Sequence, residues 1–449
     1  MKKKTVKIIL IIVGAIVLFI VASGLYIYNF TQKSEKITGK QESVPLKTTA
    51  LDVITKGSSD RTSWQGQNFD KKSSFTGIAK DWSKGLKKVW EVNYLCQGKQ
   101  SATWSAPVIQ GNVMIVPGRD EKNDLIFCLN AQTGELFWKG SYEAKTNDNH
   151  GPGARATPFI DNERVYTYGR GGDLVCWNLR DGQILWHKKA SDIGGSEPDW
   201  GYSSSPLVFG NKVLIQAGGK ALAAAYDKIT GELLWTSGNG PGGYAPLNVF
   251  VADSSLLLFS GEALSGLNKE TGALNWTLPW VVEYKVNAAT PLSSGNIIFV
   301  TSGYGKGSMA VKIENNKPVV LWQSKALEGQ QTDPVLVDGY VYGYSGNSSS
   351  NKGELVCLQL SDGKVMWKTP KAGMGTLAYA DGCLVCLDVK GNLCLVETNP
   401  DKFMKTCEFK KAIPGVKHPA WTAPVIANGK LYLRYLQSIV CYDIDSGSY

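Results

Sequence analysis

The chain has 449 residues, a formal net charge of +9 and 43% hydrophobic residues, so it can bury a sizeable core. The first 60 residues hold nine Lys and four acidic residues, which leaves the remainder only mildly basic. No Lys/Arg stripe with interleaved aromatic residues follows, and this excludes a nucleic-acid-binding protein.

An uncharged apolar run from Ile8 to Tyr28 follows a Lys-rich start. Its length matches the roughly 20 residues of a transmembrane helix and exceeds the roughly 7–15 apolar residues of a secretory signal. A cleaved signal peptide, cut near Val21-Ala22-Ser23, is the alternative, and the lack of a closely following Cys argues against lipoprotein processing. We expect residues 1–7 to be a cytoplasmic stub, 8–28 a membrane anchor and 29–62 a polar tether, with the following domain outside the cytoplasm.

A repeat then runs through residues 63–449. Five copies have a Thr-Gly or Asp-Gly turn, where Gly supplies the positive φ of a tight hairpin, followed by a strand that ends in Trp. Two further copies, which lead to Trp322 and Phe409, have degenerate turns without this Gly. These aromatic residues recur every 41 to 49 residues, a period that suits one four-stranded propeller blade per repeat. They are expected to pack between blades, and they are Trp90, Trp138, Trp186, Trp235, Trp276, Trp322, Trp367 and Phe409.

The two ends of the repeat region complement each other. The last copy stops near Asp443 without a fourth strand, whereas residues 86–93 form a fourth strand without a blade. Pairing them closes the ring and removes two exposed sheet edges. The sequence therefore predicts an all-β, eight-bladed propeller closed by its N-terminal strand, with seven blades as the alternative.

The nine cysteines do not form an obvious disulfide framework or metal site. Five recur at one strand position in different blades, too far apart to bridge, and are expected to be small buried hydrophobic residues. Cys383 and Cys386 lack a second such pair and nearby His residues, so no zinc site is expected. The five are Cys128, Cys176, Cys357, Cys394 and Cys441.

The Thr-Gly-x-x-x-Trp repeat resembles the PQQ-like repeat of quinoprotein alcohol dehydrogenases and of the propeller lipoprotein in the bacterial outer-membrane β-barrel assembly machinery. Stretches beginning at Trp64, Trp200 and Ser302 resemble uncharacterised bacterial extracytoplasmic members, although Gln65 stands where that group often has Arg. The resemblance is a strong indication of the fold. It is a weak indication of the function, because the function of a propeller resides in the loops carried by the scaffold.

The loops that join the fourth strand of one blade to the first strand of the next (D–A loops) converge on the propeller axis. Together with the B–C loops, which bring Arg119, Arg170 and Arg434 to the same face, they are rich in aromatic and polar side chains. We expect a funnel that stacks a planar or sugar-like ligand and pairs with an anion; the alternative is that these side chains only fill the channel. The candidates are Trp104, His150, Arg155, Trp200, Tyr202, Tyr244, Lys306, Gln331, His418 and Trp421.

Two functions compete on this evidence. The first is a membrane-anchored binding or scaffold module of the cell envelope, with an envelope protein, a small molecule or a glycan as its partner. The second is a PQQ-dependent dehydrogenase, for which the resemblance implies a calcium ion, a catalytic Asp and often adjacent cysteines. No two cysteines are adjacent, and Asp333, the one weak candidate base, precedes Pro334 and could simply cap a turn. No C-x-x-C-H, G-x-S-x-G or H-E-x-x-H motif is present, so a binding module is favoured.

Overall fold

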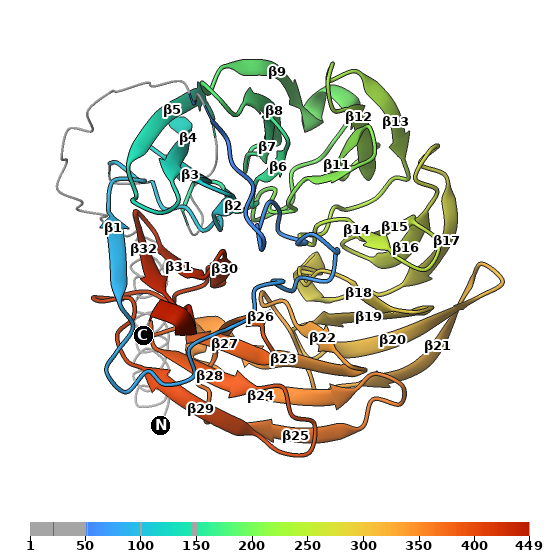
Figure 1. Ribbon diagram of the computed structural model, residues 1–449. Helices are drawn as coiled ribbons and strands as arrows, with labels where there is room; N and C mark the ends of the chain where they lie inside the picture. The colour runs from blue at the N-terminus through green and yellow to red at the C-terminus, as the bar shows by residue number, and fades with distance from the viewer. Residues whose placement is uncertain (1–20, 22–50, 52, 99–100, 146–150, 449) are drawn as a thin grey trace, which may run out of the picture.

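Eight four-stranded sheets are arranged around one axis in the computed structural model of the chain, which describes residues 21, 51, 53–98, 101–145 and 151–448 (Figure 1). Neighbouring strands run antiparallel, and in seven of the sheets the strands follow sequence order from the axis outward, whereas the eighth ends with the first strand of the chain. The eight-bladed propeller predicted from the repeat is therefore confirmed.

The strands of the first four complete blades are β2 (Val108–Gln110), β3 (Val113–Arg119), β4 (Asn123–Asn130) and β5 (Leu136–Glu143); β6 (Phe159–Asp161), β7 (Arg164–Tyr168), β8 (Asp173–Asn178) and β9 (Ile184–Lys189); β10 (Leu207–Phe209), β11 (Lys212–Gln216), β12 (Ala223–Asp227) and β13 (Leu233–Ser237); β14 (Asn248–Phe250), β15 (Ser255–Phe259), β16 (Ala263–Leu267) and β17 (Leu274–Pro279).

The next three blades consist of β18 (Leu292–Ser294), β19 (Ile297–Ser302), β20 (Gly307–Glu314) and β21 (Lys317–Ser324); β22 (Val335–Val337), β23 (Tyr340–Asn347), β24 (Lys352–Gln359) and β25 (Val365–Thr369); β26 (Gly375–Ala380), β27 (Cys383–Asp388), β28 (Leu393–Glu397) and β29 (Met404–Phe409). Short 3-10 turns are η1 (Ala190–Ile193), η2 (Glu283–Lys285), η3 (Ser348–Ser350) and η4 (Ser446–Ser448).

The eighth blade joins the two ends of the propeller. It consists of β30 (Val425–Ala427), β31 (Lys430–Tyr435), β32 (Ser438–Asp443) and β1 (Lys88–Val92). Strand β1 pairs antiparallel with β32, with Trp90 opposite Cys441 and Glu91 opposite Val440. This is the closure predicted from the orphan strands, and Figure 1 shows β1 at the outer edge of that blade.

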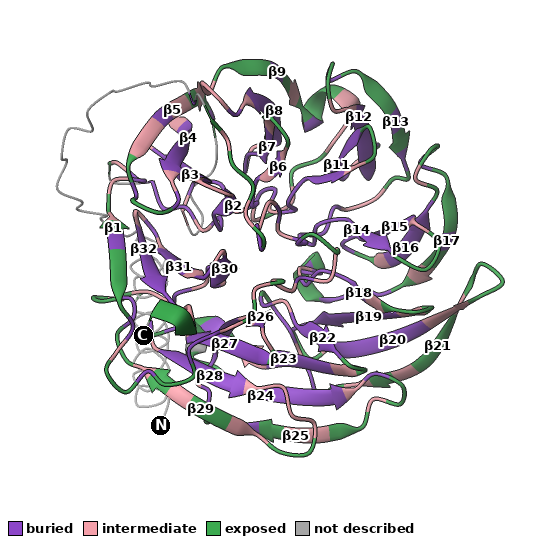
Figure 2. Ribbon diagram, in the orientation of Figure 1, coloured by how far each residue is buried: buried purple, intermediate pink, exposed green. Residues whose placement is uncertain are grey.

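The repeated Trp residues join neighbouring blades. The Trp138 indole N–H donates to the Leu179 carbonyl at 2.9 Å, and that of Trp90 donates to the Ala131 carbonyl at 3.1 Å. Five of the rings, those of Trp90, Trp138, Trp186, Trp235 and Trp322, also lie on the turn glycine of the next blade: a Cβ added to Gly182 would be 2.4 Å from Trp138. The turn therefore needs glycine for its space as well as for its positive φ. Inner strands are buried and outer strands alternate with solvent (Figure 2).

The N-terminal segment before β1 crosses the ring on the face opposite to the D–A loops. It pairs with first strands of several blades: Arg61 bridges to Ile109, the Ile160 N–H donates to the Thr62 carbonyl, and the Ser73 N–H donates to the Tyr379 carbonyl. The segment crosses the centre of the ring in Figure 1. Its described residues up to 62, which the sequence assigns to the tether, already contact the propeller, since Leu51 is buried beside β2 and β3.

The predicted membrane anchor lies outside the described residues, except for Val21. Among the residues that are described, no helix has the length and apolar composition needed to cross a membrane. All nine cysteines are described; each is an unpaired thiol, and all but the half-buried Cys407 are buried. Burial raises the pKa of Cys357 and Cys441 to about 12, so these thiols stay protonated, as expected of small core residues.

Candidate functional site

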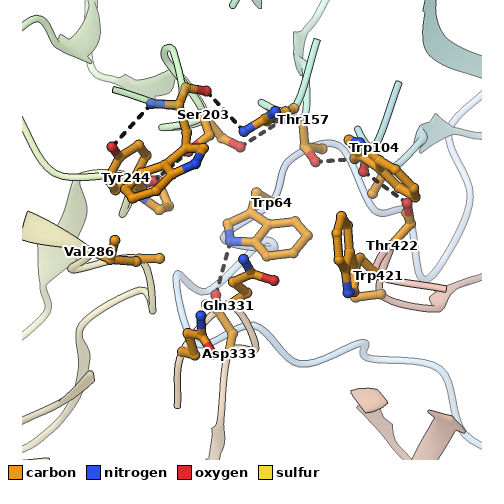
Figure 3. Close-up of a pocket in the computed structure, with 18 of the residues that line it drawn as sticks. Trp64, Trp104, Thr157, Ser203, Tyr244, Val286, Gln331, Asp333, Trp421 and Thr422 are labelled. Atoms are coloured by element: carbon orange, nitrogen blue, oxygen red, sulfur yellow. Dashed lines mark hydrogen bonds between the residues drawn. The ribbon is translucent and has the colours of Figure 1, made fainter. Parts of the chain in front are cut away.

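A cavity of about 390 Å³ opens at the axis on the D–A loop face. Its volume lies at the lower end of the ~300–1,000 Å³ range of small-molecule sites. The side chains that surround it come from several blades, because each D–A loop ends beside the axis (Figure 3). They are Trp64, Trp104, Ala106, Arg155, Thr157, Trp200, Ser203, Ser205, Tyr244, Pro246, Val286, Ala288, Tyr304, Gln330, Gln331, Asp333, Asn347, Ser349, Trp421, Thr422 and Ala423.

Trp64, from the N-terminal segment, forms the floor. It sits at the centre of the ring of wall residues in Figure 3, and its indole N–H donates to Thr290 Oγ1 and to Asp333 Oδ2, both at 3.0 Å. The Lys71 ammonium lies 3.4 Å from the Trp64 ring centroid, a cation–π contact, and forms a buried ion pair with Asp333. The N-terminal segment therefore closes the axial channel from the opposite face.

The Asp333 carboxylate is fully engaged in this floor. Besides the Trp64 and Lys71 contacts, its Oδ1 accepts the Thr290 backbone N–H at 3.0 Å, and its Oδ2 accepts the Thr290 hydroxyl. Burial lowers the pKa of Lys71 to about 8 even though Asp333 acts to raise it. Lys71 therefore remains a cation at neutral pH, and Asp333, which it contacts, is not placed as a free base.

Tilted aromatic rings form the walls. The Trp104 and Trp421 centroids are 4.8 Å apart with the ring planes at 52°, and Trp200 and Tyr244 are 5.9 Å apart at 57°. Tyr284, which is 55% exposed, continues the second wall toward the mouth at 6.0 Å from Trp200. These rings give the cavity a large apolar contact area in several orientations.

Two guanidinium groups meet at one backbone carbonyl in the wall. Arg155 Nη1 donates to the Trp200 carbonyl at 2.9 Å, and Arg170 Nε donates to the same oxygen at 3.2 Å. Burial, followed by repulsion from Arg170, lowers the pKa of Arg155 to about 9. Arg155 therefore remains a cation at neutral pH, held close to a second cation.

The other buried B–C arginines hold loops in place. Arg119 Nη2 donates to the Ala144 carbonyl at 2.9 Å, and its Nη1 pairs with Asp124 at 2.7 Å. Arg434 Nη1 donates to the Ser105 carbonyl at 2.9 Å. Arg119 thus holds the start of one D–A loop and Arg434 the end of another, and neither side chain lines the cavity.

The predicted funnel residues divide into two groups. Those that line the cavity are Trp104, Arg155, Trp200, Tyr244, Gln331 and Trp421, together with the candidate base Asp333. Their role in binding a ligand stays a prediction.

The other candidates lie elsewhere. Tyr202 is buried, and its hydroxyl donates to the Ala217 carbonyl at 2.8 Å. Lys306 lies 4.3 Å from the Trp280 ring centroid. His418 is bound through its backbone N–H to the Tyr435 hydroxyl and does not line the cavity. His150 is outside the described residues.

The sequence prediction does not include Trp64 among the site residues. Trp64 lies before the repeat, whereas the predicted candidates come from the loops between the strands of the blades. Tyr304 and Gln330 were also missed. The Gln330 amide donates to the Tyr304 hydroxyl at 3.0 Å at the cavity rim. An isolated Trp in a polar stretch, outside any strand of the repeat, was the available signal for Trp64.

The cavity does not fit a PQQ–calcium centre. Calcium takes six to eight oxygen ligands, usually including several carboxylates. Asp333 is the one carboxylate among the described lining residues, and the Lys71 ammonium already pairs with it. Across the described part of the chain, no group of three or more His, Cys, Asp and Glu residues is placed to hold a metal ion.

Comparisons with known proteins agree with this architecture. A protein named outer membrane protein assembly factor BamB from Moranella endobia is 26% identical over 260 residues, which span 54% of this chain and 63% of the relative. The solved structure of BamB from Moraxella catarrhalis superposes with a TM-score of 0.58 at 13% identity, covering 80% of this chain and 99% of that one. Quinohemoprotein alcohol dehydrogenase from Comamonas testosteroni superposes with a TM-score of 0.61 at 13% identity, covering 86% and 80%.

At such identities the superpositions establish the fold alone. The chain spans less than two thirds of the length of its Moranella endobia relative. The family profile is more extensive: the one described as outer membrane protein assembly factor BamB matches residues 122–369, more than half of the chain. The chain therefore belongs to the BamB family of PQQ-like β-propellers.

Proposed function

We propose that this protein is a binding and scaffold module of the bacterial cell envelope, anchored by residues 8–28 with its propeller outside the cytoplasm. The family supports the envelope setting, since its relatives are named as assembly factors of outer membrane proteins. The uncharged run from Ile8 to Tyr28 supports the anchor. An envelope protein is accordingly its main partner.

The hydrogen bonds of Asp333 are the observation that favours a binding site over a catalytic one. A general base needs an available carboxylate within reach of a substrate proton. Both Asp333 oxygens instead accept hydrogen bonds from Trp64, Lys71 and Thr290. The cavity is thus an aromatic pocket that is closed at one end, and the Asp333 carboxylate holds the residues of that end in place.

Site-specific photocrosslinking tests the partner-binding face. A photoreactive residue in place of Tyr284, which is 55% exposed on the D–A face, should give adducts with envelope proteins in intact cells. The matched control is Ile229, which is 49% exposed in a C–D turn on the opposite face. Equal labelling at both positions, or none at Tyr284, would contradict the proposal.

Calorimetry with PQQ and Ca²⁺ tests the competing enzyme function. That function is worth testing because solved quinohemoprotein alcohol dehydrogenases share this fold. We expect no one-to-one binding in the micromolar range and no dye-linked alcohol oxidation. Tight binding accompanied by oxidation would replace the scaffold proposal with an oxidoreductase.

A further inference from the structure

Two cysteines of the seventh blade lie directly opposite each other on neighbouring strands. Cys386 of β27 is paired with Cys394 of β28 in the antiparallel register, and both side chains belong to one buried cluster between the sixth and seventh blades. The other four cysteines of the repeated set are paired with Ile or Tyr on the second strand of their blades. The seventh blade therefore places two thiols side by side in a largely apolar interior.

The backbone spacing at this position suits a disulfide. The Asp388 N–H donates to the Asn392 carbonyl at 2.9 Å. Because hydrogen-bonded pairs recur at every second residue, Cys386 and Cys394 form the next such pair, with Cα atoms about 5.5 Å apart. A disulfide spans Cα distances of roughly 4.4–6.8 Å. Opposed Cβ atoms are about 4.5–5.5 Å apart, slightly more than a relaxed disulfide allows, so this bond needs a small strand shift and is easily reduced.

Cys394 is the more reactive thiol of the two. The Cys386 thiol donates to the Cys394 sulfur, which lowers the pKa of Cys394 and raises that of Cys386. Burial, Asp388 and Glu408 act in the opposite direction on Cys394, whereas Lys405 lowers its pKa further. The pKa of each of the other eight thiols is raised. Because the thiolate is the nucleophile, oxidation of the pair begins at Cys394, which is 6% exposed.

We propose that Cys386 and Cys394 form a reversible disulfide when hydrogen peroxide reaches the propeller. The Cys394 sulfur attacks one peroxide oxygen, the O–O bond breaks, and the other oxygen leaves as water with the thiol proton, which gives a sulfenic acid. The Cys386 sulfur then attacks the Cys394 sulfur, and its proton leaves with the sulfenic hydroxyl as a second water. Two thiols thus lose two electrons and one peroxide is reduced to two waters.

This modification site goes beyond the proposed function. The proposed function supplies only the setting outside the cytoplasm, where disulfides form and persist.

Peptide mapping of the full chain in detergent, without reductant, tests the bond. Trypsin cuts after Lys390, between the two strands, so the disulfide joins the peptides 372–390 and 391–402. The chain is first reduced and freed of reductant. A small excess of hydrogen peroxide should then join the two peptides in more than half of the chains, and dithiothreitol should release them. Cys357 and Cys441 should stay thiols under the same treatment.

Cys383 provides the matched control, because it shares peptide 372–390 with Cys386 but packs toward the eighth blade. Cys383→Ala should keep the linked peptides, and Cys386→Ala should lose them. Cys386→Ser keeps a hydroxyl donor without the second sulfur, so Cys394 should accumulate as sulfinic acid instead. Thermal melting shows whether each variant is folded.

Three results would overturn the assignment. The first is a folded chain that gives no linked peptides after peroxide, and the second is linkage that persists in Cys386→Ala. The third is oxidation of Cys441 as fast as that of Cys394. Each would leave the partner crosslinks from Tyr284 intact, so failure of this assignment is distinguishable from failure of the proposed function.

Discussion

At the scale of single residues, the ion pair between Lys71 and Asp333 is the central interaction of the cavity floor. Its side chains are 7% and 8% exposed. Lys71→Met should destabilise the protein by about 3–5 kcal/mol, because it leaves a buried carboxylate without its counter-charge. Chemical denaturation followed by Trp fluorescence measures this loss.

Lys72→Met is the matched control for that substitution. Lys72 is the next residue and pairs with Asp70 at 3.3 Å, but both side chains are about 30% exposed. Such a pair contributes at most about 1 kcal/mol. Adding Asp333→Asn to Lys71→Met should recover part of the loss, since the uncompensated charge is then gone. If the two lysine variants were equally stable, the Lys71–Asp333 pair would not hold the floor.

At the scale of elements, the tight turn between the third and fourth strands determines how one blade packs on the previous one. Gly182 has φ +74°, and a Cβ there would lie 2.4 Å from Trp138. Gly210 has a similar φ of +63°, with nothing within 4 Å of an added Cβ. Gly182→Ala should therefore cost about 1–3 kcal/mol more than Gly210→Ala, because both incur the left-handed backbone cost and only Gly182→Ala overpacks.

Thermal or urea denaturation of the two glycine variants measures this difference. Equal losses would mean that the turn glycines are selected by backbone conformation alone, with no contribution from the Trp packing between blades.

The same elements show how far sequence reasoning reaches. The Trp and turn-Gly period predicted the eight blades and the closing strand, because each repeat imposes the same local geometry. Convergence of the D–A loops predicted that Trp104, Trp200, Tyr244 and Trp421 would meet at the axis. Where Lys306 points depends on its packing against Trp280, which no period encodes. The path of Trp64 into the channel likewise depends on contacts with distant blades.

At the scale of the whole molecule, β1 is the strand that keeps the ring closed. A chain beginning at Tyr94 lacks β1 and leaves the β32 edge unpaired, so it should associate through that edge. A chain beginning at Lys87 keeps β1 but loses the channel floor, and we expect it to be less stable yet monomeric. Size-exclusion chromatography with light scattering distinguishes them; a monomeric Tyr94 chain with the melting temperature of the Lys87 chain would contradict this role for β1.

The pairing of β1 with β32 also has a kinetic consequence. Trp90 contacts Cys441, a partner that ribosomes add some 350 residues later. Most blades can form from contacts local in sequence, but this contact must wait until β32 has been synthesised, and contacts of such long sequence separation form slowly. Until then the nascent chain exposes unpaired strands, and it depends on chaperones to avoid aggregation. A premature stop before β32 therefore leaves an open, association-prone product, so the closing contact distinguishes chains that contain β32 from chains that lack it.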